Sequence, residues 1–169
     1  MTSLHLFELN LADYQRKNIR FNKYSQSKAI CSIVPENKND LVDLFFDAFG
    51  DYHAQDEQAW LAVGQDLHNY FSGTVHSPML NCSWGYWKGN ILIGACLLSY
   101  CKKRRCPLID CIAVRNVWRS KNVSTVLFNA SILSLIEDRQ TKVCAIISED
   151  NLLPMRLSER VGFTAIEEL

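Results

Sequence analysis

The residues best suited to chemistry lie where an apolar stretch of this 169-residue chain meets a short basic segment and the start of a helical pattern. The apolar stretch ends at Val114, Arg119 and Lys121 carry positive charge, and the helical pattern begins near Asn122. A helix N-terminus offers unpaired backbone N–H groups and a partial positive charge, both of which favour phosphate. The segment therefore predicts a site for a diphosphate group.

The apolar patterns elsewhere predict the elements that would hold this segment in place. Strands are expected over residues 29–34, 82–87, 91–98, 108–114 and 142–147, with a short stub over 163–166. Helices are expected over residues 37–49, 60–71, 122–133 and 153–161, with Asn37 as the cap of the first. This order predicts an α/β fold with a mixed central sheet and helices on both faces. The unit over residues 108–147 predicts a right-handed crossover between roughly parallel strands.

The length of the chain suits one domain with a single core. Residues 28–169 are expected to form that domain. Residues 1–27 are polar and mixed, with a short alternation of leucines, and we treat them as an N-terminal extension of unknown structure.

The basic segment resembles the phosphate loop of the GNAT superfamily, the acyl-CoA-dependent N-acyltransferases. That loop reads Arg/Gln-x-x-Gly-x-Gly/Ala at the start of a helix, and the matching residues here are Arg119, Ser120, Lys121, Asn122, Val123 and Ser124. Further stretches similar to the family are Val114 with Trp118, residues 89–94, Asn151 followed by residues 157–163, and the helix end at Ala48 and Phe49. The resemblance covers about residues 28–166. It implies a GNAT-like fold and direct acyl transfer, most simply from acetyl-CoA to a primary amine, in a ternary complex.

The resemblance also implies which residues would contact the co-substrate. The loop residues 119–124 would hold the diphosphate, and Asn151 would also contact the co-substrate. The backbone of Ile112, Ala113 and Val114 would pair with the pantetheine arm. No residue is expected to bind a metal, because the seven cysteines and four histidines show no ligand spacing.

Two residues are assigned to the chemical step. Asp110 is the only carboxylate in its strand, and alternation puts it on one face with Leu108, Ile112 and Val114. Burial there would raise its pKa toward that of a useful general base. The alternatives are that Asp110 sits at an exposed edge or pairs with an arginine. Ser158 stands where the family usually has a tyrosine that protonates the leaving thiolate, so we assign it as a hydrogen-bond donor to sulfur.

The sequence departs from the family pattern in two further places. Asn122 and Ser124 replace glycines, although Asn tolerates a left-handed backbone and Ser124 is small enough to donate its hydroxyl to a phosphate. The sequence also stops soon after Phe163, where the family usually has one more strand. The sheet would then be short, or the N-terminal extension or a partner chain would fill its edge.

The composition of the chain bears on its binding partners and on its cellular location. Eighteen basic residues balance eighteen acidic ones, which argues against general nucleic-acid binding, and no apolar run is long enough to span a membrane. A cytoplasmic location and reduced cysteines are expected, and a homodimer is possible. The acceptor is expected to be an amine. His53, His68 and His76 fall in the region that lines the acceptor pocket in the resembling family, or they are surface residues at helix ends.

A second functional class fits the same residues. The chain would be a catalytically weak or inactive GNAT-like module that binds CoA or a protein partner. The replaced glycines and the missing tyrosine favour that alternative.

Overall fold

The computed structural model describes residues 3–17, 28–49 and 57–169, and within them one eight-stranded sheet organises the chain. The strand order is β2-β4-β5-β6-β7-β1-β8, and the short β3 pairs with β5. The strands are β1 (Leu4–Asn10), β2 (Ile30–Ser32), β3 (Ser77–Pro78), β4 (Trp84–Lys88), β5 (Ile91–Cys101), β6 (Cys106–Val114), β7 (Lys142–Ser148) and β8 (Thr164–Glu168). The helices are α1 (Leu11–Lys17), α2 (Lys38–Phe49), α3 (Glu57–Ser72), α4 (Val123–Glu137) and α5 (Leu152–Val161).

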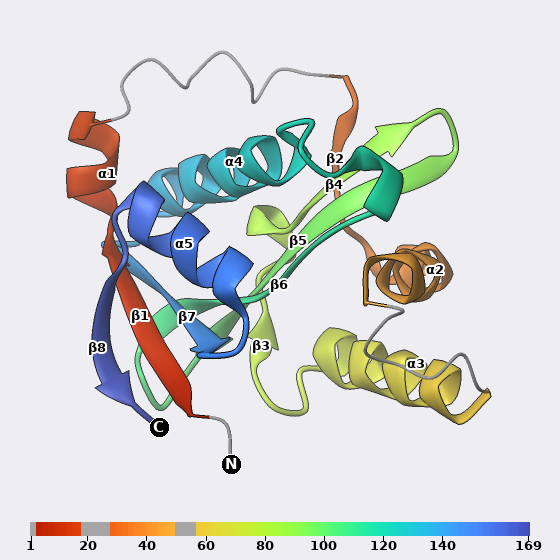
Figure 1. Cartoon of the computed structure of the whole chain (residues 1–169), viewed down its shortest axis with the longest axis horizontal. Coiled ribbons are helices and arrows are strands. Elements are labelled where there is room, and N and C mark those ends of the chain that lie inside the picture. Colours follow the sequence, from red (N-terminus) through yellow and green to blue (C-terminus); the bar gives the residue numbers. More distant parts are fainter. Residues whose placement is uncertain (1–2, 18–27, 50–56) are drawn as a thin grey trace.

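Helices cover both faces of this mixed sheet, as the sequence predicted (Figure 1). On one face, α4 buries Leu127 and Ile132 in a core that also contains Val143 of β7, and α1 and α5 add to the same core. On the other face, α2 and α3 bury apolar residues such as Leu44 and Leu67 against β5. Each helix therefore presents one apolar stripe to the sheet, which is what fixes its position.

The first strand lies inside the sheet. β1 runs antiparallel to β7 from Leu4↔Ser148 to Asn10↔Lys142, and antiparallel to β8 on its other side. Residues 4–17, which we treated as part of an extension of unknown structure, thus form β1 and α1. The N-terminal segment thus joins the sheet, as one of the three alternatives held, although it lies between β7 and β8 and not at the edge.

Most predicted elements are present, with shifted ends. The helix expected from Asn37 begins at Lys38, because residues 35–37 form a 3-10 turn. The Asn37 side chain accepts a hydrogen bond from the Val34 N–H at 3.0 Å, so it caps that turn instead of α2. The pairing of β6 with β7 is parallel, as predicted for the crossover.

Substitution of Leu9 tests how much the stability of the fold depends on β1. Its side chain is 2% exposed, whereas Leu4 on the same strand is 42% exposed. We expect Leu9→Ala to lower the free energy of unfolding by about 2–5 kcal/mol, because it removes buried methyl groups and leaves a cavity. Leu4→Ala is the matched control and should change it by about 0.5 kcal/mol or less. Denaturant unfolding measures both, and equal small effects would show that β1 is not part of the stable core.

Candidate functional site

The candidate site is built around the place where β6 and β7 stop pairing. Their parallel ladder has only two pairs, Leu108↔Cys144 and Ile109↔Ala145. Beyond them β6 continues to Val114 and β7 to Ser148 without pairing to each other. We call these two free ends, residues 110–114 and 146–148, the fork. In open α/β sheets, ligands bind beyond the carboxyl ends of strands that part in this way.

A β-bulge accounts for the start of the fork. In the ladder between β5 and β6, Leu97 pairs with Cys111 and Leu98 pairs with Ile109, so Asp110 has no partner. An extra residue of this kind bends its strand and increases its twist. The fork therefore begins at Asp110, directly after the last pair between β6 and β7.

The bulge also changes which residues of β6 share a face of the sheet, and the prediction for Asp110 did not include it. Leu108 packs with Leu6 and Cys144 on one side of the sheet, while Ile112 and Val114 pack against the core beneath α4. The extra residue shifts the alternation by one, so Leu108 cannot share a face with Ile112 and Val114. The predicted single face of four residues is wrong for this reason.

The backbone of β6 is free on its fork side at alternate residues. The Arg115 N–H donates to the Ile93 carbonyl at 2.9 Å, which fixes the hydrogen-bonded pairs of the antiparallel ladder with β5. By alternation the N–H and C=O groups of Ala113 point toward β5. Those of Ile112 and Val114 point toward the fork. Of the three predicted backbone contacts, Ile112 and Val114 are thus the two whose polar groups are available there.

The loop between β6 and α4 has the backbone that a phosphate loop needs. Ser120 and Asn122 have positive φ angles of 60° and 61°, and Asn122 is the N-cap residue of α4. Asn122 thus adopts the left-handed conformation expected at a glycine position. Its side chain makes no capping hydrogen bond, so it leaves the first N–H groups of α4, at Val123 and Ser124, uncapped.

The basic residues of this loop are engaged with the protein. Arg119 is exposed, yet its guanidinium donates to the Ala48 carbonyl at the end of α2. The Lys121 ammonium lies 4.7 Å from the centre of the Trp118 ring, and Lys88 lies 4.8 Å from the same ring. Sequence reasoning missed Lys88 and the role of Trp118, because their contact joins two distant segments.

Asp110 has an unusual environment for a carboxyl group. Its side chain reaches solvent, but the surrounding protein removes enough water to raise its pKa from 3.8 to about 6. Nearby Ser99 and His76 offset part of this rise. The Ser99 hydroxyl is fully buried and has no hydrogen-bond partner within normal distance among the described residues. Asp110 is thus exposed on an inner strand and not at an edge of the sheet, and none of the ion pairs among the described residues joins it to an arginine.

The other predicted residues lie on α5, which follows β7. Asn151 is exposed at the N-cap of α5 and makes no side-chain cap. Ser158 is 7% exposed, and its carbonyl accepts hydrogen bonds from the Gly162 and Phe163 N–H groups. The structure thus places the loop and Asn151 after the two ends of the fork, Asp110 at its base and Ser158 on the helix beyond.

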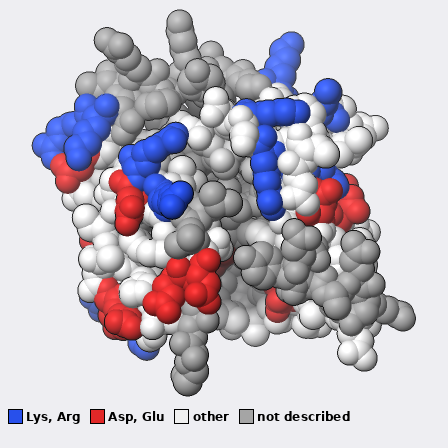
Figure 2. Space-filling view, viewed as in Figure 1, with Lys and Arg blue, Asp and Glu red and all other residues white. Residues whose placement is uncertain are grey.

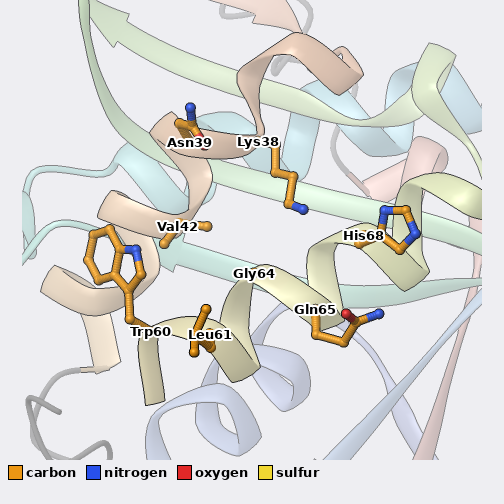
Figure 3. Close-up of a pocket in the computed structure, with 8 residues that line it drawn as sticks. All are labelled: Lys38, Asn39, Val42, Trp60, Leu61, Gly64, Gln65 and His68. Atoms are coloured by element: carbon orange, nitrogen blue, oxygen red, sulfur yellow. The ribbon is translucent and has the colours of Figure 1, made fainter. Parts of the chain in front are cut away.

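A separate groove of about 620 Å³ lies between α2 and α3 (Figure 3). His68 and Lys38 line one end of it, and Trp60 lines the other. None of the residues predicted to bind the co-substrate lines this groove. His76 is half-buried just before β3, and His53 falls outside the described residues.

The charged side chains on the surface are mixed in sign, and the described residues contain neither a cluster of metal ligands nor a helix that could cross a membrane. On the face shown in Figure 2, Lys and Arg side chains form separate groups, and acidic groups lie beside several of them. Among the described residues, no cluster of three or more His, Cys, Asp or Glu could hold a metal ion. No helix in the described part is long and apolar enough to cross a membrane.

The fold, with its forked sheet and its loop at a helix N-terminus, is that of the GNAT-type acetyltransferases, as its match to solved structures shows. One such structure is a GCN5-related N-acetyltransferase from Sphaerobacter thermophilus, with a TM-score of 0.64, 14% identity, and coverage of 99% of this chain and 49% of that one. Another is the PaiA N-acetyltransferase from Thermoplasma acidophilum in complex with coenzyme A, with a TM-score of 0.63, 11% identity, and coverage of 80% and 88%.

A third match, to a conserved protein of unknown function from Staphylococcus epidermidis, has a TM-score of 0.63 and 13% identity and covers 99% of this chain and 59% of that one. The chain therefore spans only about half of the Sphaerobacter protein and three fifths of the Staphylococcus protein. No protein-family profile and no curated protein matches the sequence.

The raised pKa of Asp110 predicts how stability changes with pH. Between about pH 4 and pH 6 the folded state holds a proton that the unfolded state has released, so stability falls as pH rises through this window. Asp110→Asn removes that group, and we expect the variant to gain stability relative to the wild type as pH rises from 4 to 7. Denaturant unfolding at both pH values measures the difference. Asp66→Asn, which removes an exposed carboxylate from α3, is the control. If the free energy of unfolding of Asp110→Asn changed with pH in the same way as that of Asp66→Asn, the prediction would be contradicted.

Proposed function

We propose that the protein is an acyl-CoA-dependent N-acyltransferase that transfers an acyl group, most simply acetyl, directly to a primary amine. The observation that carries this proposal is the fork, with free backbone groups along one edge and a helix N-terminus at its end. Those two features match the two chemically distinct parts of acyl-CoA, a chain of amides and a diphosphate.

The edge of β6 suits the amide-bearing arm. An extended chain can add to a free strand edge through backbone hydrogen bonds, and Ile112 and Val114 direct their N–H and C=O groups to that side. The uncapped N–H groups of α4 then face the diphosphate, with Ser120 and Asn122 bringing the backbone close. The solved complex of the Thermoplasma acetyltransferase with coenzyme A supports this choice of co-substrate.

The residues around the bulge suit the chemistry. The amine nitrogen attacks the thioester carbonyl, a C–N bond forms, the C–S bond breaks, and Asp110 accepts the proton from nitrogen. A free N–H of β6 polarises the carbonyl oxygen, and Ser158 donates a hydrogen bond to the departing sulfur. A thiolate with a conjugate pKa of about 8.5 leaves without a strong acid, so a serine in place of a tyrosine is tolerable.

The cysteines support a cytoplasmic location for this reaction. All seven are free thiols, and most are buried. Stable disulfides mark oxidising compartments, and the chain has none among them. The acceptor is proposed only as an amine.

A second candidate is a binding module that keeps the fold and lacks the reaction. It is favoured by the Arg119 guanidinium, which already bonds to Ala48, and by the serine at position 158. Such a module would bind CoA or a protein partner without releasing thiol.

Calorimetric titration with acetyl-CoA, together with thermal melts, tests the co-substrate. At one hundred times Kd, binding should stabilise the fold by roughly 2.7 kcal/mol, which is a rise in Tm of about 5–10 °C. Ser124→Asp places a negative charge in the first turn of α4 and should weaken binding about tenfold or more. That charge is favourable for the helix itself, so the variant should remain folded. Absence of binding by CoA and acetyl-CoA to the wild type would reject the proposal.

Thiol release from acetyl-CoA in the presence of a panel of amines tests the chemical step. We expect the rate to rise through about pH 6 as Asp110 loses its proton, and Asp110→Asn to lower it by about 10²–10⁴-fold. Ser158→Ala should lower kcat by a smaller factor and leave KM for acetyl-CoA unchanged. Full activity in both variants would show that the assigned roles are wrong, and binding without turnover would favour the module.

A further inference from the structure

A set of hydrogen bonds joins α2 to the loop that precedes α4. On the loop the participants are Arg115, Asn116 and Arg119, and on α2 they are Asp43, Asp47 and Ala48. We call this set the clamp. Its two halves are about seventy residues apart in the sequence, so it is a tertiary feature of this fold.

The clamp fixes both the backbone and the side chains of the loop. The Asn116 backbone N–H donates to Asp47 Oδ2 at 2.7 Å, and the Asn116 side-chain amide donates to the Asp47 carbonyl at 2.5 Å. The Arg115 guanidinium donates to Asp43 Oδ2 at 2.7 Å and to the Leu92 carbonyl at 2.7 Å. Arg115 is 16% exposed and Asp43 is 62% exposed, so the ion pair is open to water on the side of Asp43 and contributes little by itself.

The same contacts complete the C-terminal end of α2. The last carbonyls of a helix have no partner within it and carry partial negative charge. Asn116 and Arg119 donate to two of them, at Asp47 and Ala48. Loop and helix therefore satisfy each other's polar groups, and neither can move without leaving the other's groups unpaired.

The loop needs such external support because it has left-handed residues without glycine. Ser120 and Asn122 both have φ near +60°, a conformation that costs a side-chain-bearing residue on the order of 1 kcal/mol or more. Strained conformations persist where the surrounding structure determines them. The clamp holds the loop just before both residues, at Arg115, Asn116 and Arg119.

We propose that Asp47 is a positioning residue that holds the diphosphate loop in its binding shape, so that co-substrate binding and the stability of α2 are coupled. Asp47 does not touch the co-substrate; it acts through Asn116. The ligand part of this inference rests on the proposed function, whereas the effect on loop shape does not. Because coupling is reciprocal, a ligand that stabilises the loop also stabilises α2. Since α2 packs on α3, the effect extends to the helix pair that forms the groove in Figure 3.

Three variants test the role of Asp47. Asp47→Ala removes the acceptor for the Asn116 N–H, Asp47→Asn keeps an acceptor oxygen in the same place, and Asp66→Ala removes an exposed carboxylate from α3 as the control. Titration with acetyl-CoA should give a Kd about tenfold higher for Asp47→Ala, the value expected for one lost hydrogen bond to a charged group. The Kd of Asp47→Asn should be close to that of the wild type, and the Kd of Asp66→Ala should equal that of the wild type.

Hydrogen exchange supplies a readout that simple destabilisation would not reproduce. In the wild type, acetyl-CoA should slow amide exchange in residues 115–125 and also in α2. In Asp47→Ala the slowing should persist near α4 and become weaker in α2, because one contact of the clamp is lost and the others remain. Equal slowing of α2 in both proteins, or an unchanged Kd for Asp47→Ala, would overturn the proposal.

The same experiment separates this inference from the proposed function. Without any ligand, Asp47→Ala should speed exchange in residues 115–122 and leave β7 unchanged, because the clamp shapes the loop before anything binds. If the wild type binds no CoA and this local effect is present, the proposed function fails and the positioning role stands. If the loop exchanges at the same rate in both proteins, the positioning role fails whatever the wild type binds.

Discussion

The architecture of the site depends on one constraint, the single extra residue at Asp110 in the ladder between β5 and β6. Without the bulge, β6 would continue alongside β7 and pair with it to the end. With it, the two strands pair at only two positions, and the backbone beyond is left with unused donors and acceptors. Buried or half-buried peptide groups must be satisfied, so a free strand edge inside a sheet calls for a ligand that resembles a strand.

A second physical condition concerns the loop at the end of β6. Its left-handed residues carry side chains, and the loop donates hydrogen bonds to α2, a helix on the face of the sheet opposite α4, which hold it in this shape. A glycine loop would need no such support. The chain thus has tertiary contacts at a place where a glycine loop would rely on residue type alone, and the loop and α2 satisfy each other's polar groups.

Local patterns were sufficient for much of the fold. The apolar stripe of α2 and the apolar run of β6 predicted those elements, and the order of elements predicted the parallel pairing of β6 with β7. The loop 119–124 was also predicted as a strand-to-helix connection, and Asn122 is a residue type that tolerates the left-handed conformation it adopts there. These features depend on residues close in sequence, where propensity and periodicity carry the information.

Other features depend on contacts that a linear pattern does not contain. The bulge at Asp110 has no signature in its residue types, and it reversed the facing of Ile112 and Val114 relative to Leu108. Asp43 and Asp47 read as the solvated face of an amphipathic helix, although they hold the loop. β1 was missed because its short alternation of leucines gains meaning only when β7 and β8 lie on either side.

The position of β1 has a consequence for biosynthesis. Residues 4–10 leave the ribosome well before their two neighbours in the sheet, which are residues 142–148 and 164–168. An apolar strand that includes Leu6, Phe7 and Leu9 therefore stays unpaired while about 130 further residues are synthesised. Contacts of such long sequence separation form slowly, and exposed strand edges favour association with other chains. During that interval the nascent chain exposes an apolar segment, and such segments favour binding by chaperones that shield extended apolar peptides.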